Sequence, residues 1–423
     1  MMRIVVLSVG SRGDVQPYLA LARGLRHVGH DVVLAAPPTF AALAETYRVP
    51  FAPVGPDWRT LLQQQQFQTI VETGRWVQEL PKLARAVRIA IEQLLHDAWT
   101  VVQGAEALVA AVIGPLGSSL AERRGIPYIE AAMQPLTPTA AFPSAAVTLP
   151  MDLGVVGNQL SHRLLEQLFW QLYRRHINRF RRRVLGQAPY PFWGPMEALR
   201  RAGVTRLYAF SPLVVPRPTD WPAATAVTGY WFLPTLPGWR PASQLEAFLA
   251  AGPPPVYVGF GSMFGSDPEA TLRLVLRALA LSGQRGVLAR GWGGLVTERA
   301  LPEQSILIDE APHDWLFPQM AALVHHGGAG TTGAGLRAGV PAVVVPHLFD
   351  QAFWARRVAA LGAGPALIPR PQLTAERLAV AITAAVEQPQ LRAAAQSVGT
   401  QIRAERGVAQ AVDQIHRALG LTR

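Results

Sequence analysis

The chain has 423 residues, half of them apolar and 16% charged, which is an ordinary globular composition and enough length for two domains. It contains no cysteine, which excludes disulfides, thiolate zinc sites and cysteine nucleophiles and makes a cytoplasmic location the expectation. The formal net charge of +11 suits a polyanionic ligand or an anionic membrane, whereas nucleic acid ranks last because no nucleic-acid-binding motif accompanies the charge. The apolar runs are too short to predict a signal peptide or a membrane span.

The first half of the chain alternates apolar runs with amphipathic segments. Residues 3–9 predict a buried strand, residues 10–14 a loop, residues 17–28 a helix that begins at Pro17, and residues 31–36 a second strand. This order is typical of a doubly wound parallel sheet, so the predicted fold class is α/β. Further strands are expected at residues 49–54, 107–113 and 127–130.

Residues 158–184 predict one long amphipathic helix. Its leucines recur every four residues, and its end is rich in arginine. Two interpretations stay open. The helix packs on the core with a solvated basic end that suits the helix dipole, or the basic end contacts an anionic membrane surface.

A proline-rich stretch divides the chain, and the α/β alternation restarts after it. We place the first domain at residues 1–215, a linker at 216–241, the second domain at 242–407 and a final helix at 408–423. In the second half, strands are expected at residues 256–260, 286–289, 306–308, 321–324 and 342–345.

The most informative stretch runs from the strand at residues 321–324 into a helix. His326 and the glycines at 327, 328 and 330 form the turn between them, and Thr331 opens the helix. Such a turn lets the backbone approach a ligand, and the helix start offers unpaired N–H groups, so it predicts a diphosphate site that is neither a Rossmann motif nor a P-loop. Asp350 and Gln351 follow the next strand. Each feature alone is common, and an isolated His326 would more often be a core histidine.

Taken together, His326, Gly328, Gly330, Thr331 and the Asp350–Gln351 pair resemble the donor signature of nucleotide-sugar glycosyltransferases with the GT-B fold. The resemblance implies two doubly wound Rossmann-like domains that face each other across a cleft, with the final helix crossing back onto the first domain. It assigns the diphosphate to His326, Gly328, Ala329, Gly330 and Thr331, and the sugar hydroxyls to Asp350 and Gln351.

Residues 10–17 resemble the opening of bacterial glycopeptide glycosyltransferases and sterol glucosyltransferases. By this resemblance Asp14 is the catalytic base, and Ser11, Arg12 and Gly13 lie at the donor. Plant relatives carry a histidine in the position of Asp14. The alternative is that Asp14 only caps the following helix.

The remaining site residues are also assigned by resemblance. Contacts to the nucleoside and phosphate are expected from Ser262, Trp292, Pro312 and His313. An insertion at residues 57–103 and the loop after residue 130 would supply an apolar acceptor pocket that contains Trp58, Phe67, Trp76, Met133 and Phe142, although such aromatics are more often plain core.

We therefore expect an inverting glycosyltransferase that moves a hexose, expected to be glucose from UDP-glucose, to a hydroxyl of a lipophilic acceptor such as a sterol, polyketide or flavonoid. No Asp-x-Asp motif is present, so we expect no metal and no other cofactor. Two alternatives remain: a nucleotide-sugar epimerase on the same fold, and an inactive homologue that binds and activates a partner. A cytoplasmic location with peripheral contact to an anionic membrane completes the expectation.

Overall fold

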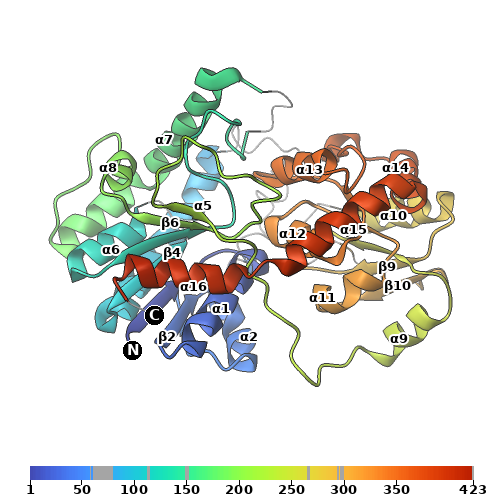
Figure 1. Cartoon of the computed structure of the whole chain (residues 1–423), viewed down its shortest axis with the longest axis horizontal. Helices are drawn as coiled ribbons and strands as arrows, with labels where there is room; N and C mark the ends of the chain where they lie inside the picture. The colour runs from blue at the N-terminus through green and yellow to red at the C-terminus, as the bar shows by residue number, and fades with distance from the viewer. Residues whose placement is uncertain are drawn as a thin grey trace. The chain divides into compact units, whose positions relative to one another are not determined.

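The computed structural model describes residues 1–57, 59–60, 80–111, 115–147, 152–263, 267–292, 295 and 300–421. The chain divides into two compact units, each built around a parallel sheet (Figure 1). Within the described residues, unit 1 comprises 1–57, 81–233 and 406–421, and unit 2 comprises 59–60, 80 and 234–405.

Among the described residues, unit 1 contains a seven-stranded sheet with the order β3-β2-β1-β4-β5-β6-β7, and every pair in it is parallel. The strand order reverses between β1 and β4, where open α/β sheets bind ligands at the carboxyl ends of the strands. The strands are β1 (Arg3–Leu7), β2 (Asp31–Ala36), β3 (Phe51–Pro53), β4 (Ala107–Ala111), β5 (Tyr128–Ala132), β6 (Thr205–Tyr208) and β7 (Thr225–Val227).

Helices cover the sheet of unit 1, and their apolar side chains form its core. Val5, Leu7 and Leu108 of the sheet pack with Leu94 of α5 and Ile177 of α7 in one buried cluster. Both faces of a parallel sheet are covered in this way, which explains why its strands read as continuous apolar runs. The helices are α1 (Arg12–His27), α2 (Ala41–Thr46), α5 (Leu80–Val101), α6 (Leu116–Arg124), α7 (Gly154–Phe180), α8 (Met196–Arg201) and α16 (Gly407–Ala418).

The first helix begins earlier than predicted. α1 starts at Arg12, so residues 12–14 are helical and Pro17 lies inside the helix. Ser11 is the N-cap residue with an extended backbone, and its N–H donates to the Asp14 side chain three residues later. This capping-box arrangement sets the helix start, and the preference of proline for the first helical position was the wrong signal.

Unit 2 contains, in its described part, five parallel strands with the order β10-β9-β8-β11-β12. Its order reverses between β8 and β11, which pair directly, with His325 beside Gly259. The strands are β8 (Val256–Gly259), β9 (Gly286–Ala289), β10 (Ser305–Ile308), β11 (Ala322–His325) and β12 (Ala342–Val344). All five strands lie within two residues of their predicted positions.

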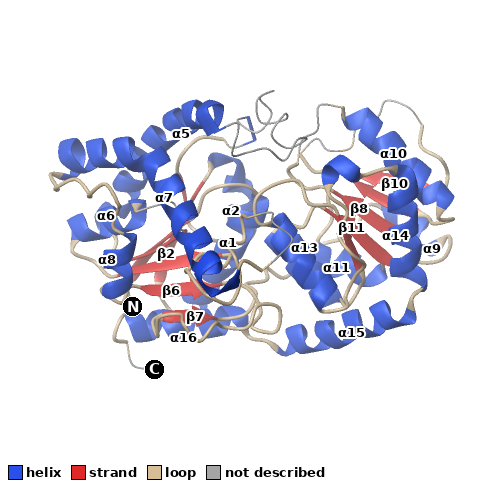
Figure 2. Cartoon of the chain, turned by 90° about the horizontal axis from the view of Figure 1, so that it is seen from above, coloured by secondary structure: helices blue, strands red, loops and turns tan. Residues whose placement is uncertain are grey.

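The helices of unit 2 cover both faces of its sheet (Figure 2). Successive side chains of β11 point to opposite faces and contact different helices. Ala322 and Val324 belong to the cluster that also contains Leu272 of α10 and Leu378 of α14. Leu323 points the other way, and a Cβ added at Gly335 of α12 would lie 2.8 Å from its Cδ1. The helices are α9 (Ser243–Ala250), α10 (Pro268–Leu281), α11 (His313–Leu316), α12 (Ala329–Ala338), α13 (Gln351–Ala360), α14 (Ala375–Glu387) and α15 (Pro389–Ala404).

The segment predicted as a linker, residues 216–241, is partly built into unit 1. It contains β7, which pairs with β6, and the unit extends to Leu233. The prolines of this segment, such as Pro222 and Pro234, interrupt the periodicity from which a strand is predicted, although the strand between them forms. At the other end of the chain, α16 packs along α1, where Gly24 leaves room for Val408 and Val412.

Candidate donor and base sites

The carboxyl ends of β8 and β11 frame the candidate donor site of unit 2, at the position where its strand order reverses. The loop after β8 carries Gly261 and Ser262, and the turn after β11 carries His326. The loops after β9 and β10 carry the other predicted nucleoside contacts. The Trp292 N–H donates to the Gly261 carbonyl at 3.0 Å, which joins two of these loops.

Glycine is required at the turn into α12. Gly327 has φ +91°, and a Cβ there would lie 2.8 Å from Val344 Cγ1 and 2.9 Å from the Gln351 carbonyl oxygen. Gly328 is the N-cap residue of α12, and no side chain caps the helix. The first N–H bonded within the helix is that of Thr332, to the Gly328 carbonyl at 2.9 Å.

The N–H groups of residues 329–331 therefore have no carbonyl acceptor within α12. They lie at the positive end of a ten-residue helix, which favours an anion. Ala329, Gly330 and Thr331 are all half-buried. The predicted diphosphate residues are thus adjacent in space, and their backbone carries N–H groups without an acceptor in the helix.

His326 lies against this turn in a narrow slot between two glycines. A Cβ at Gly328 would lie 2.5 Å from its Nε2, and one at Gly261 would lie 2.8 Å from its Cε1. The ring is 8% exposed, and Nδ1 has no hydrogen-bond partner in the described structure. Burial lowers the pKa of His326 to about 4, against a smaller opposing effect of its hydrogen bond with Gly259. The imidazole is therefore neutral near pH 7 and interacts as a polar group, not as a cation.

The pair after β12 has partners within its own unit. The Gln351 Oε1 accepts from the N–H groups of His347 at 2.7 Å and Leu348 at 3.0 Å, so this side chain holds the loop before α13. Asp350 is the N-cap residue of α13, and its Oδ2 accepts from Trp354 Nε1 at 2.6 Å. Phe349 has φ +49°, an uncommon conformation for a non-glycine residue.

Pro312 and His313 begin α11, after β10. The ring of His313 stacks on Phe317, with centroids 4.1 Å apart, and lies edge-on to Tyr257. One face of His313 is thus occupied within unit 2. Trp292 is half-buried on the neighbouring loop.

Asp14 is the candidate base, in the first turn of α1 after β1 of unit 1. Its Oδ2 accepts from the Ser11 N–H at 2.8 Å and from the Ser11 hydroxyl at 3.0 Å. Burial raises the pKa of Asp14, and the two hydrogen bonds from Ser11 oppose that rise. The residue therefore caps the helix, and it also has the raised basicity expected of a general base. Arg12 Nε donates to Gln16 at 3.2 Å, and Gly13 is exposed.

Two predicted acceptor residues lie on the loop after β5 of unit 1. Met133 is buried, and half-buried Phe142 contacts the ring of His162 on α7. Several side chains fix this loop: Thr139 donates to Asp220 at 2.7 Å, and the Ser144 N–H donates to Ser161 at 2.8 Å. Trp58, Phe67 and Trp76 lie outside the described residues.

Sequence reasoning missed a buried ion pair beneath this loop. Glu130 of β5 pairs with Arg206 of β6, and the exposed fractions are 1% and 5%. Arg206 Nη1 also donates to the Thr137 hydroxyl at 3.0 Å, and Tyr208 bonds the same threonine. Removing one partner of a buried ion pair strongly destabilises a protein. Because Arg206 and Tyr208 both bond Thr137, the pair also anchors the loop that starts at residue 133. The signal was a single charged residue inside each apolar strand.

The prediction that the leucines of α7 pack on the core holds only in part. Leu160 and Leu164 are 51% and 61% exposed, whereas Trp170 and Ile177 make the core contacts. The basic end is also mixed, because Arg181 is buried against Glu122 at 2.8 Å. Among the described residues, no helix has the length and apolar character needed to cross a membrane.

Two domain families match the chain. The family described as glycosyltransferase family 28 N-terminal domain matches residues 4–143, and the erythromycin biosynthesis protein CIII-like C-terminal domain matches residues 293–417. A sterol 3-beta-glucosyltransferase of Arabidopsis thaliana is 37% identical over 431 residues, which cover 99% of this chain and 68% of that protein. The chain belongs to the family of the sterol 3-beta-glucosyltransferases.

Fungal members of this family are longer. Sterol 3-beta-glucosyltransferases of Cryptococcus neoformans and Penicillium rubens are each 36% identical over 99% of this chain, which spans only 27% and 30% of their length. Solved structures share the fold at lower identity. The kitacinnamycin glycotransferase has a TM-score of 0.71 at 21% identity, and the calicheamicin glycosyltransferase has 0.66 at 19%, each covering 99% of this chain and 98% or more of its own. The two parallel-sheet units are those of the GT-B fold.

Proposed function

We propose that this protein is an inverting glycosyltransferase that transfers a hexose, glucose from UDP-glucose, to a hydroxyl of a lipophilic acceptor of the sterol type. One observation carries the proposal. At the strand-order reversal of unit 2, the unpaired N–H groups of α12 lie beside the buried His326, in a chain 37% identical to a sterol 3-beta-glucosyltransferase.

The donor diphosphate would occupy the N-terminus of α12. When the sugar–oxygen bond breaks, negative charge develops on the leaving diphosphate, and the N–H groups of residues 329–331 with the helix dipole would stabilise it. His326 would add a hydrogen bond through Nε2, the ring nitrogen that lies beside Gly328. Because these groups supply stabilisation that a bound cation supplies elsewhere, we propose turnover without a metal. Asp350 and Gln351 would fix the sugar end.

Asp14 would accept the proton of the acceptor hydroxyl. The oxygen then attacks the anomeric carbon from the side opposite the diphosphate, the carbon–diphosphate bond breaks, and the configuration inverts. The raised pKa of Asp14 makes it a stronger base than an exposed carboxylate, and the two hydrogen bonds from Ser11 keep its orientation. This assignment places the base in unit 1 and the donor in unit 2.

The acceptor assignment is supported by the names of the relatives and by the loop after β5. Half-buried Phe142 offers apolar surface there, Met133 is buried in the same loop, and the network around Glu130 and Arg206 braces the loop. A fused-ring lipid binds better to a rigid apolar surface than to a flexible polar surface.

The test is a transfer assay with UDP-glucose and ergosterol, run in excess chelator, with dTDP- and GDP-glucose as alternative donors. We expect a steryl glucoside of β configuration from the α-linked donor, with UDP-glucose the best substrate. An α product would contradict inversion, and loss of activity in chelator would contradict the metal-free mechanism. Release of free sugar or an epimer without acceptor would support the epimerase alternative instead.

We also propose that α7 contacts the membrane that holds such an acceptor. Val156, Leu160 and Leu164 are exposed on one side of this helix, and Trp193 nearby is 73% exposed. Arginines 175, 179, 182 and 183 are exposed on and after the same helix. Exposed apolar and aromatic side chains flanked by arginine suit an anionic bilayer surface. The test compares how much of the parent chain and of a Leu160→Gln, Leu164→Gln double variant pellets with phosphatidylserine liposomes. Equal pelleting of the two proteins would contradict this contact.

A further inference from the structure

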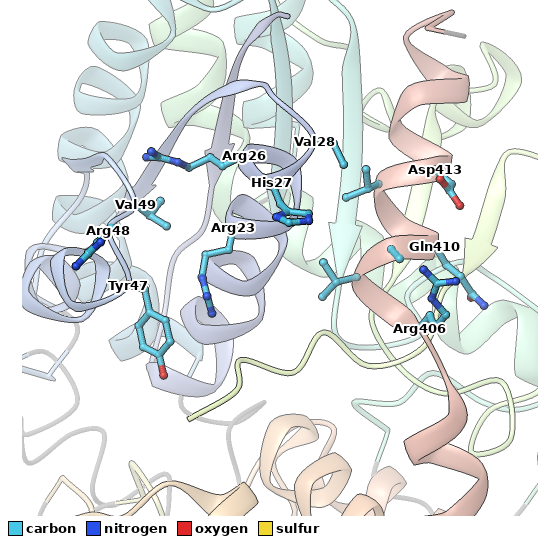
Figure 3. Close-up of a pocket in the computed structure, with 14 residues that line it drawn as sticks. Arg23, Arg26, His27, Val28, Tyr47, Arg48, Val49, Arg406, Gln410 and Asp413 are labelled. Carbon is cyan, nitrogen blue, oxygen red and sulfur yellow. The ribbon is translucent and has the colours of Figure 1, made fainter. Parts of the chain in front are cut away.

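A basic pocket lies in unit 1, separate from the residues assigned to the donor and the base. It has a volume of about 970 Å³ and opens between the end of α1, the turn after α2 and the start of α16. Figure 3 shows Arg23 and His27 of α1 between Arg48 on one side and Arg406 on the other. Arg23 follows Asp14 by nine helical residues, about 14 Å along the axis of α1.

Basic side chains outnumber acidic ones among the described residues that line this pocket. Arg23, Arg26, Arg48 and Arg406 line it, together with a single carboxylate from Asp413. Within the described parts of the chain, none of these four arginines forms an ion pair, whereas Arg181, Arg200, Arg206 and Arg277 elsewhere all do. Arg23 lies over the ring of Tyr47 at 5.1 Å, which directs the guanidinium without cancelling its charge.

Two of the arginines occupy positions that the local backbone disfavours. Arg48 has φ +54° just after α2, where its N–H bonds the Glu45 carbonyl and glycine is the usual residue. Arg406 is the N-cap residue of α16, where serine, threonine or aspartate is preferred and the helix dipole repels a cation.

The helix dipole explains only some of the basic residues that line the pocket. Arg26 and His27 lie in the last turn of α1, where a cation is favoured by the dipole. That argument does not apply to Arg48 or Arg406, which come from different elements and line the same pocket. Positions that cost stability and line one cavity are characteristic of binding sites.

We propose that this pocket binds a ligand that carries two or more phosphate groups. Guanidinium groups pair with phosphate through two parallel hydrogen bonds, and arginines from three separate elements call for more than one phosphate. A pocket of this volume is also larger than a single phosphate needs. The ligand is either a soluble polyphosphate or the phosphorylated headgroup of a membrane lipid.

The ligand would connect two segments of unit 1 that are far apart in the sequence. Arg406 begins the segment that returns to this unit, and Arg48 belongs to the turn between α2 and β3. Bound phosphates bridging them would hold α16 against α1 and stabilise the folded state in proportion to their concentration.

The test compares the full chain with a double variant, Arg48→Gly with Arg406→Ser. Each replacement suits its local backbone, so the variant should fold at least as stably as the parent chain. Arg123→Ser with Arg124→Ser removes the same charge from an exposed helix end of unit 1 outside the pocket and is the matched control. The probes are tripolyphosphate and phosphatidylcholine vesicles with and without phosphatidylinositol bisphosphate, measured by calorimetry and by co-sedimentation.

We expect the parent chain and the control to bind one of the probes, and the double variant to bind it at least tenfold more weakly. Loss of tripolyphosphate binding would identify a soluble ligand, and loss of binding to the bisphosphate vesicles alone would identify a lipid headgroup. Equal affinity of the parent and the double variant for the probes would overturn the proposal. That result would also be obtained if the probe bound only at the diphosphate site of unit 2. The absence of binding to both probes would overturn the proposal as well.

Discussion

Asp14 carries two roles in this account, and a single substitution separates them. Asp14→Asn keeps an oxygen that can accept from the Ser11 N–H, so α1 should remain capped, but an amide cannot take a proton from the acceptor. We expect the transfer rate to fall by about 10²–10⁴-fold while the unfolding midpoint changes little. The measurement is kcat together with thermal unfolding.

A control for the lost capping charge is Asp267→Asn at the start of α10, where Oδ1 accepts from the Ala270 N–H at 2.7 Å. It should leave the transfer rate unchanged. A folded Asp14→Asn variant that turned over near the wild-type rate would remove Asp14 from the mechanism.

Three buried histidines of unit 2 predict a loss of stability in mild acid. Burial lowers the pKa of His326 to about 4, and of His325 and His347 to about 3. In the unfolded chain these rings titrate near 6.5. As the pH falls below that value the unfolded state takes up protons that the folded state refuses, so stability falls between pH 6.5 and about 4 and is unaffected above pH 7.

The expected change is a few kcal/mol in the free energy of unfolding, measured by urea denaturation from pH 7.5 to 4.5. His347→Asn should reduce this pH dependence, because asparagine can still donate to the Val345 carbonyl that His347 Nδ1 contacts at 2.8 Å. His27→Asn, at an exposed position on α1, is the control and should leave the dependence as it is. An identical pH dependence in the His347 variant and the wild type would contradict the assignment.

At the scale of elements, the turn between β11 and α12 depends on Gly327. Gly327→Ala combines a left-handed backbone with contacts of 2.8 and 2.9 Å to Val344 and Gln351, so we expect a loss of roughly 2–4 kcal/mol in unfolding free energy. Gly29→Ala has a similar φ of +93° but nothing within 4 Å of the added Cβ, and should cost only about 1 kcal/mol. Equal losses in a denaturant titration would show that the close packing of this turn is not limiting.

Local signals in the sequence carried much of this element and of its neighbours. The apolar run before His326 and the glycines after it predicted the strand, the turn and the helix within two residues, because each depends on residues adjacent in the chain. The same reasoning failed for the start of α1, where Pro17 was weighed above the Ser11–Asp14 cap. It also overstated the core packing of Leu160 and Leu164, because spacing reveals a stripe and not what covers it.

Contacts between distant residues were beyond such reasoning. The Glu130–Arg206 pair and the stack of His313 on Phe317 depend on which elements meet in the fold. So does the bracing of the loop before α13 by Gln351 Oε1. These partners restrict what the side chains can offer a substrate, and they are set by the folded chain, not by neighbours in sequence.

At the scale of the whole molecule, the chain carries two parallel sheets, and each has a strand-order reversal with a candidate functional group beside it. Asp14 follows β1 in unit 1, and the turn into α12 follows β11 in unit 2. The proposed mechanism therefore assigns proton removal to one unit and diphosphate binding to the other. The fold alone is shared with glycosyltransferases of different natural products, so the fold does not identify the acceptor.

The most direct test of the central claim is a crystal structure of the full chain with UDP. We predict diphosphate oxygens at about 2.7–3.2 Å from the N–H groups of Gly330 and Thr331, with His326 at hydrogen-bond distance through Nε2. A diphosphate bound anywhere other than the N-terminus of α12 would contradict it.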